Sequence, residues 1–193
     1  MALRLGPLRF PWPGRASAGD PYWDFFVSTP PSDPSNAVTE IIRRAPEGAV
    51  FPAKADLHSP EITSRHIKEL ARYLGADLVG IASLGSPAAE SGEGYPFGIV
   101  CVVRADYDPR KAAGVGGQAP AQNGLFVTFV LSAYIRELGY RATPSGDADA
   151  ERLAATAGLG RLNADGRLVA ARYGSRAHVA DMIRTDLPLV ADG

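Results

Sequence analysis

The chain has 193 residues, of which 46% are hydrophobic and 21% charged, and its net charge is −1. This length and composition suit one globular domain with a sizeable core. The near-zero charge, without a block of like charges, excludes a nucleic-acid-binding surface. No run approaches the roughly 18 apolar residues of a membrane span. The N-terminus also lacks the continuous apolar core of a signal peptide, so we expect a cytoplasmic protein.

Residues 1–57 differ in character from the rest of the chain. Prolines interrupt every potential periodic element, yet the segment is too aromatic for a disordered tail. Its aromatic residues are Phe10, Trp12, Tyr22, Trp23, Phe25, Phe26 and Phe51. We therefore predict an extended arm, with a short helix at 36–44. The arm docks either on the chain's own core or, as its apolar character favours, on a partner subunit or a second copy of the chain.

The globular pattern occupies residues 58–193 and opens with a helix. Ser59 is a good N-cap, and Pro60 suits the first helical position. Gly75 can take the left-handed conformation that ends a helix. The next predicted elements are buried strands at 78–82 and 99–104, each followed by a loop.

A long helix is predicted at 121–138, ending at Gly139. It is apolar around most of its circumference, so it should lie centrally in the domain. The remaining predicted elements are an extended piece at 140–143, a helix from Asp147 to Ala157, and strands at 167–171 and 178–183. This order predicts an α+β fold in which a mixed sheet is covered by helices.

The single cysteine, Cys101, limits the redox chemistry of the chain. One thiol forms neither an internal disulfide nor the set of about four thiolates that holds an iron–sulfur cluster. Cys101 lies in the apolar run 99–103 and is interpreted as an inert core residue. His58 and His66 have no carboxylate at metal-ligand spacing, so no metal site is predicted.

The segment after the last predicted helix is rich in glycine. It contains Gly158, Leu159, Gly160, Asn163 and Gly166. Glycines here let a ligand approach the backbone closely. In the alternative interpretation, Gly158 is a helix C-cap and Asp165 with Gly166 forms a type I′ hairpin turn.

Basic and aromatic side chains surround a predicted turn at 174–175. They are Arg172, Tyr173, Arg176, His178 and Arg184. Arginine binds phosphate or carboxylate through paired hydrogen bonds, and histidine ligates metals or shuttles protons. If one continuous strand follows the turn, His178 shares a face with Ala180 and Met182 and is instead a packed side chain.

Six segments carry a resemblance to a known family, in order and at matching spacing. They are LGADLVGIA (74–82), IRELGY (135–140), ATPSG (142–146), AGLG (157–160), YGSR (173–176) and TDLPL (185–189). Together they resemble the cobalamin-binding core of reductive dehalogenases and, more distantly, epoxyqueuosine reductases. The resemblance implies a nitroreductase-like core that buries a corrinoid with its lower base detached.

The resemblance also implies roles for individual residues. Arg176 matches the family's arginine near the substrate pocket, and we add Tyr107 and His178 as candidate catalytic residues. The predicted cofactor-binding residues are Gly158, Leu159, Gly160, Asn163, Gly166, Tyr173 and Gly174. Ala121 stands near the position of the family's proton-donating tyrosine. The family's iron–sulfur cysteines follow the TDLPL segment, whereas this chain ends at Gly193, so we expect an iron–sulfur electron donor in trans.

Two functions follow as hypotheses. The first is a cobalamin-binding redox protein of reductive dehalogenase type that depends on a separate electron-transfer partner. The alternative is a non-catalytic accessory subunit that has lost its cofactor and wraps a partner with its N-terminal arm. Flavin binding ranks last, because the sequence lacks a strong basic cluster for the flavin phosphate.

Overall fold

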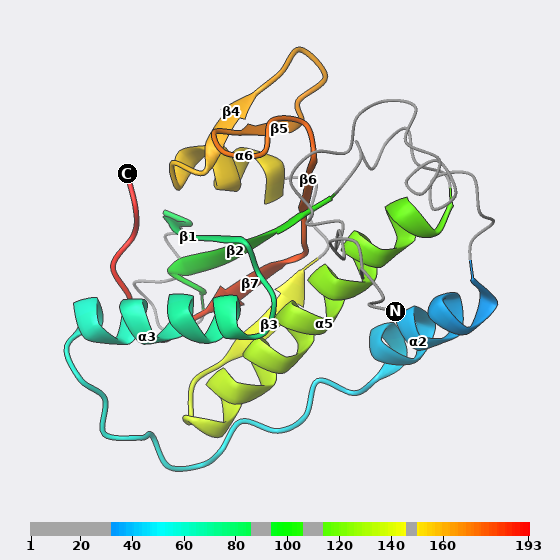
Figure 1. Ribbon diagram of the computed structural model, residues 1–193. Coiled ribbons are helices and arrows are strands. Elements are labelled where there is room, and N and C mark those ends of the chain that lie inside the picture. The colour runs from blue at the N-terminus through cyan, green and yellow to red at the C-terminus, as the bar shows by residue number, and fades with distance from the viewer. Residues whose placement is uncertain (1–31, 86–93, 106–113, 146–149) are drawn as a thin grey trace, which may run out of the picture.

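The computed structural model describes residues 32–85, 94–105, 114–145 and 150–193. A β-sheet lies at the centre with layers on both of its faces (Figure 1). One layer consists of α3 (Pro60–Tyr73) and α5 (Val115–Glu137), and the other of α6 (Ala150–Thr156) with the hairpin of β4 (Gly160–Leu162) and β5 (Leu168–Ala170). Each layer encloses its own apolar core against the sheet. The predicted α+β fold is confirmed.

The main sheet contains five strands. In order they are β1 (Leu78–Ser83), β2 (Phe97–Arg104), β7 (Met182–Thr185) and β3 (Ala142–Ser145), and β6 (Ala177–Val179) also pairs with β2. Every described pairing is antiparallel, so the expectation of a mixed sheet is wrong. A loop suffices to join consecutive antiparallel strands such as β1 and β2, whereas parallel strands need a long crossover. Ile81 and Ile99 face α3 and α5, while Val100 and Val102 face α6.

Helix α3 begins and ends where the sequence predicts. Ser59 occupies the N-cap and Pro60 the first turn. Gly75 follows the helix with φ +116°, a conformation that favours glycine. Ile67 and Ala71, four positions apart, are fully buried against the sheet.

Helix α5 is central, as its apolar sequence predicts, but it begins at Val115 instead of at 121. The loop-favouring residues inside its first turns are Gly116, Gly117 and Pro120. Helix α2 (Asp33–Arg44) packs beside this end of α5 (Figure 1). Gln118 Oε1 accepts a hydrogen bond from Ser32 N at 2.9 Å, and Gln118 Nε2 donates to Ser32 O at 3.0 Å. Tertiary contacts therefore outweigh the weak local propensity.

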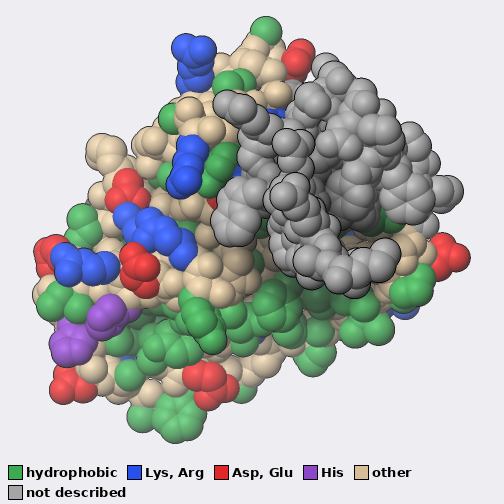
Figure 2. All heavy atoms as spheres, viewed as in Figure 1, with side chains coloured by type: hydrophobic (Ala, Val, Ile, Leu, Met, Phe, Trp, Pro, Cys, Tyr) green, Lys and Arg blue, Asp and Glu red, His purple; other side chains and the backbone are tan. Residues whose placement is uncertain are grey.

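The outer side of α5 leaves aromatic surface uncovered by described residues. Phe126 is 46% exposed and Tyr134 is 45% exposed. Figure 2 shows hydrophobic side chains gathered in a band across the lower half of this face of the molecule.

Residues 45–57, here called the strap, run from α2 along the C-terminal half of α5 (Figure 1). Phe51 N donates to Arg136 O and Ala55 N donates to Leu138 O, both at 2.9 Å. The described part of the predicted N-terminal arm therefore rests on the chain's own core.

Helix α2 confirms the short helix predicted at 36–44, although it starts at Asp33. Phe51 of the strap is 52% exposed and does not enter the core. The arm's other aromatic residues, from Phe10 to Phe26, lie outside the described residues, so their docking stays a prediction.

An extra residue divides the last predicted strand into β6 and β7. His178 pairs with Val103, and Arg184 pairs with Gly98. Six positions separate these two residues on their own strand, but only five separate their partners on β2. The additional residue near Asp181 makes a β-bulge, which shifts side chains to the opposite face.

The bulge overturns the expectation that His178, Ala180 and Met182 share one face. A Cβ placed on Gly124 of α5 would lie 2.9 Å from Ala180 Cβ and 3.3 Å from His178 Cδ2, so both residues face α5. Met182 lies in the other core, with α6. The alternation of side chains in the sequence does not show where a β-bulge changes the pairing register.

The C-terminal segment covers the outer edge of β1. Asp192 N donates to Ile81 O at 2.7 Å, and Ile81 N donates to Asp192 Oδ2 at 2.9 Å. The same carboxylate binds Lys68 Nζ at 2.5 Å, which links α3 to the strand. Leu187 and Leu189 are buried beneath this segment. The outward backbone N–H and C=O of Ile81 on this edge strand are thus satisfied within the chain.

Replacing Asp192 with alanine should lower the free energy of unfolding by about 1–3 kcal/mol, because the Ile81 N–H loses its acceptor. Urea unfolding measures this difference. Glu69→Ala is the control, since its exposed ion pair with Arg72, at 2.7 Å, contributes about 0–1 kcal/mol. Equal effects of the two substitutions would contradict the edge-covering role of Asp192.

Smaller differences concern the ends of elements. The extended piece predicted at 140–143 is β3, two residues later. Helix α6 ends at Thr156, next to the predicted Ala157, and its predicted cap Asp147 lies outside the described residues. Among the helices of the described ranges, none has both the length and the apolarity needed to cross a membrane.

Candidate functional site

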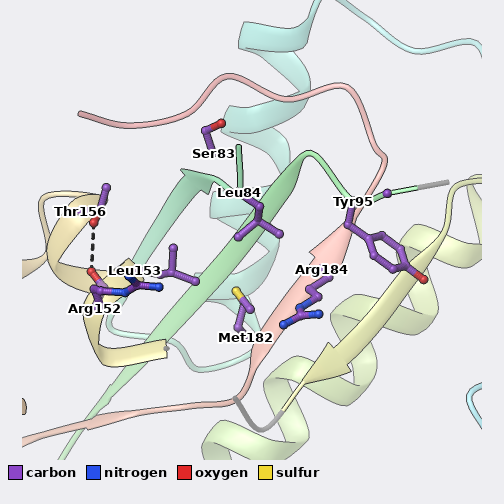
Figure 3. A pocket seen from close by; sticks show the side chains of 9 residues that line it. Ser83, Leu84, Tyr95, Arg152, Leu153, Thr156, Met182 and Arg184 are labelled. Carbon is purple, nitrogen blue, oxygen red and sulfur yellow. Dashed lines mark hydrogen bonds between the residues drawn. The ribbon is translucent and has the colours of Figure 1, made fainter. Parts of the chain in front are cut away.

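A cavity of about 530 Å³ opens between α6 and the adjoining ends of β1, β2 and β7 (Figure 3). Arg152 and Leu153 enter it from α6, and Arg184 and Tyr95 lie on the opposite side. The full set of lining residues is Ser83, Leu84, Gly94, Tyr95, Arg152, Leu153, Thr156, Met182 and Arg184. The cavity combines two permanently charged guanidinium groups with apolar side chains.

The apolar part of the cavity depends on a glycine in the strand beneath it. A Cβ placed on Gly98 would lie 2.6 Å from Met182 Sδ and 3.1 Å from Leu84 Cδ2. Glycine at this position therefore lets both side chains settle close to the sheet. The β-bulge also shapes the cavity, because it turns the side chains of Met182 and Arg184 toward α6.

Neighbouring residues fix the polar side of the cavity. Tyr95 Oη lies 3.2 Å from Thr143 Oγ1, and the guanidinium carbon of Arg141 lies 5.1 Å from the centre of the Tyr95 ring. Arg141 binds Asp186 at 2.8 Å and donates to Gly94 O at 3.0 Å. The hydrogen bond that Arg141 donates to the Asp186 carboxylate raises the pKa of Arg141 above its ordinary value. These contacts hold the tyrosine in place as a hydrogen-bonding group.

The predicted glycine-rich turn forms part of the β4–β5 hairpin. Gly158 ends α6 with φ +75° and Gly166 has φ +72°, as the structural alternative predicts. Gly160 packs so closely on β5 that a Cβ would lie 2.4 Å from Val169 O. Leu159 contacts β1, where a Cβ on Gly80 would lie 3.1 Å from its Cγ.

The hairpin turn itself differs from the predicted type I′. Asn163 Oδ1 accepts hydrogen bonds from Asp165 N at 3.0 Å and Arg167 N at 2.9 Å, and Gly166 N donates to Asn163 O at 3.0 Å. Among the described residues, no residue other than glycine has positive φ, which excludes type I′ because Asp165 would need it. Asn163 therefore organises a three-residue loop with glycine last.

The predicted residues that follow the hairpin surround the far end of β2. Tyr173 Oη donates to Asp77 Oδ1 at 3.4 Å, and Gly174 has φ +60° within its turn. Arg176 is exposed, and its carbonyl accepts a hydrogen bond from Ala105 N at 3.1 Å. The backbone of this turn is thus tied to the sheet, while the Arg176 side chain faces outward.

His178 lies half-buried on β6, beside α5. Burial lowers the pKa of His178 below its ordinary value, although the charge of Asp181 opposes the shift. Burial therefore favours the neutral form of this imidazole over the imidazolium. Ala121 lies on α5 one turn before Gly124, which contacts this histidine.

The structure separates the predicted catalytic residues from the cavity. His178 is level with Val103 on β2, while Arg184 is level with Gly98. Five strand positions correspond to roughly 17 Å. The cavity lining includes none of the nine described residues among those predicted as catalytic or cofactor-binding. Tyr107 lies outside the described residues, so the structure does not place it.

The sequence analysis missed Tyr95 and Arg152 and grouped Arg184 with the wrong neighbours. Tyr95 follows a loop, and Arg152 stands on a seven-residue helix, so neither shows a local pattern that marks a site. Cys101 is fully buried, and burial raises the pKa of its thiol to about 12, in accord with an inert core cysteine. His58 and His66 stack edge to face at 5.8 Å. Within the described ranges, no three His, Cys, Asp or Glu side chains are placed to hold a metal ion.

Comparison with family models and with curated proteins gives no match. Solved structures do match. The N-terminally tagged catabolic reductive dehalogenase NpRdhA aligns with 82% of this chain at 21% identity and a TM-score of 0.66. Its complex with 3-bromo-4-hydroxybenzoic acid aligns with 81% at 21% identity and a TM-score of 0.65. A reductive dehalogenase structure that suggests a mechanism for B12-dependent dehalogenation aligns with 86% at 26% identity and a TM-score of 0.66.

The chain therefore has a reductive dehalogenase-like fold, as the resemblance in its sequence predicts. The present chain spans about a quarter of the length of these proteins, because each alignment covers 26% of the matched chain. The similarity extends over more than four fifths of the present chain.

Proposed function

We propose that the chain has a nitroreductase-like core that binds a corrinoid, and that it works as a redox protein of reductive dehalogenase type. We further propose that a separate iron–sulfur protein supplies its electrons. The observation that carries the proposal is the structural similarity, with a TM-score of 0.66 over 86% of the chain, to a structure described in terms of B12-dependent dehalogenation.

The cavity beside α6 fits part of a corrinoid chemically. Its volume of about 530 Å³ lies within the usual range of small-molecule sites. A corrinoid carries amide oxygens and a phosphate around a broad apolar ring. Arg152 and Arg184 suit those oxygens as hydrogen-bond donors, while Leu153 and Met182 suit the ring. These four residues are the ones we assign to holding the cofactor.

A bound corrinoid supplies cobalt-centred electron transfer, and the chain supplies binding and proton-handling groups. The apolar residues beneath the cavity exclude water from the ring. Arg176 offers an exposed guanidinium for an anionic substrate group. The proton donor stays a prediction, because His178 lies roughly 17 Å along the strand from Arg184 of the cavity and Tyr107 lies outside the described residues. The glycines at 158, 160, 166 and 174 stay candidates for backbone contacts with the cofactor.

The proposal predicts that the purified full chain, incubated anaerobically with hydroxocobalamin, retains about one cobalt per chain through gel filtration. Arg152→Ala should weaken retention about tenfold, since a charged hydrogen bond is lost. Arg167→Ala is the matched control. This exposed arginine lies outside the cavity lining and pairs with Glu151, the neighbour of Arg152 on α6. Elution of the wild-type chain free of corrinoid would contradict the proposal.

The alternative of an accessory subunit gains no support from the described residues. Helix α2 and the strap contact α5 of the same chain. Contact of residues 1–31 with a partner or a second copy stays a prediction.

A further inference from the structure

A second cavity, of about 170 Å³, lies where α2, the strap, α5 and the β-bulge meet, beside β3. Figure 1 shows α2 alongside α5 in this region. It is distinct from the cavity beside α6, with which it shares no lining residue. Its polar lining residues are Arg43, Glu47, Thr128, Ser132, Arg136 and Asp181.

Three polar residues of α5 form a row along this cavity. Thr128, Ser132 and Arg136 follow one another at intervals of four, so they share one face of the helix. Their exposed fractions are 0%, 0% and 5%. The Thr128 hydroxyl donates to Gly124 O at 3.2 Å, and the Ser132 hydroxyl donates to Phe129 O at 2.9 Å. Both hydroxyl oxygens therefore keep lone pairs for a ligand.

Arg136 is a buried cation that makes no direct ion pair with a described carboxylate. Its Nη1 donates to Ala142 O at 2.7 Å. No carboxylate among the described residues lies within ion-pairing distance of it. Burial lowers the pKa of the guanidinium, while the charges of Glu47 and Glu137 oppose the shift. A buried charge is costly unless it is paired, so this site favours an anionic group.

The lining of this cavity also includes a carboxylate, that of Asp181, apart from the Arg136 guanidinium. Asp181 lies half-buried at the bulge and makes no ion pair with Arg136 in the structure. Arg43 and Glu47 lie exposed at the rim and add one charge of each sign. A simple anion would meet repulsion from Asp181, and a simple cation would meet repulsion from Arg136. A molecule with both charges avoids both penalties.

We propose that this cavity binds a small zwitterion, an α-amino acid of the size of glycine or alanine. The ligand carboxylate binds the Arg136 guanidinium, and its ammonium group binds the Asp181 carboxylate together with the Thr128 and Ser132 oxygens. The volume equals that of about six water molecules, which excludes large side chains. The site is independent of the proposed corrinoid.

Isothermal titration calorimetry of the full chain with glycine, acetate, methylammonium and tryptophan tests the proposal. Glycine should bind saturably at one site per chain. Acetate and methylammonium should bind at least about tenfold more weakly, because each satisfies one charge only. Tryptophan should not compete. Absence of saturable glycine binding, or acetate binding as tight as glycine binding, would overturn the proposal.

A substitution that preserves shape separates binding from folding. Arg136 also supports the Ala142 carbonyl, so its replacement risks unfolding, whereas Asp181→Asn removes a charge from a half-buried position. D181N should weaken glycine binding about tenfold while thermal melting and corrinoid retention stay unchanged. Arg44→Met is the control, since Arg44 lies beside Arg43 on α2 but pairs with Glu40 in solvent. Unchanged glycine affinity in D181N would refute the assignment.

Discussion

Gly139→Ala should destabilise the protein by about 2–5 kcal/mol, one of the two largest effects that the structure predicts. Gly139 ends α5 with φ +81°. A Cβ there would lie 2.5 Å from Ala53 O and 2.8 Å from Lys54 Cα, both in the strap backbone. The left-handed conformation costs an alanine about 1–2 kcal/mol, and the clash adds about 1–3 kcal/mol because the strap must move. Urea unfolding measures the loss.

Gly48→Ala is a matched control for this substitution. Gly48 has the same φ of +81°, and a Cβ there meets only Arg136 Nε, at an ordinary 3.9 Å. This variant should lose only the conformational part, about 1–2 kcal/mol. If both variants lose equal stability, close contact between the strap and α5 does not hold in solution.

The second large effect concerns the core. Leu131→Ala should lower the free energy of unfolding by about 2–5 kcal/mol, because Leu131 is fully buried at the centre of α5 and its truncation leaves a cavity. The melting temperature should fall by about 2–4 °C for each kcal/mol. Calorimetry and urea unfolding both measure this change.

Phe126→Ala on the same helix controls for the Leu131 substitution. Phe126 is larger but 46% exposed, so its removal should cost less than the loss of Leu131. A Phe126 variant as unstable as the Leu131 variant would show that the outer face of α5 is covered in solution.

The sequence predicted elements best where local signals agreed. Helix α3 has a capping serine, a proline in its first turn and a terminal glycine, and its bounds were confirmed. Strands β1 and β2 were found as buried apolar runs. The first turns of α5 were missed because Gly116, Gly117 and Pro120 indicate a loop, whereas in the fold Gln118 of these turns is hydrogen-bonded to the start of α2. That contact joins residues 86 positions apart.

The candidate cavities were harder to predict than the fold. Tyr95, Arg152 and Arg184 meet only after β2, α6 and β7 have packed, and the bulge decides which way Arg184 faces. The four-residue spacing of Thr128, Ser132 and Arg136 was visible in the sequence. The helix around these three residues is so apolar that its sequence predicts core packing throughout, and the polar row does not stand out as a site.

The single additional residue at Asp181 has a consequence for how this protein can evolve. His178 and Ala180 contact the α5 layer, while Met182 and Arg184 belong to the α6 layer, although all four occupy alternate positions of one short stretch of chain. Substitutions at Met182 and Arg184 can therefore change the lining of the α6 cavity without disturbing the packing of His178 and Ala180 against α5. A deletion at the bulge would remove this independence, because it would exchange the two layers along the remainder of the strand.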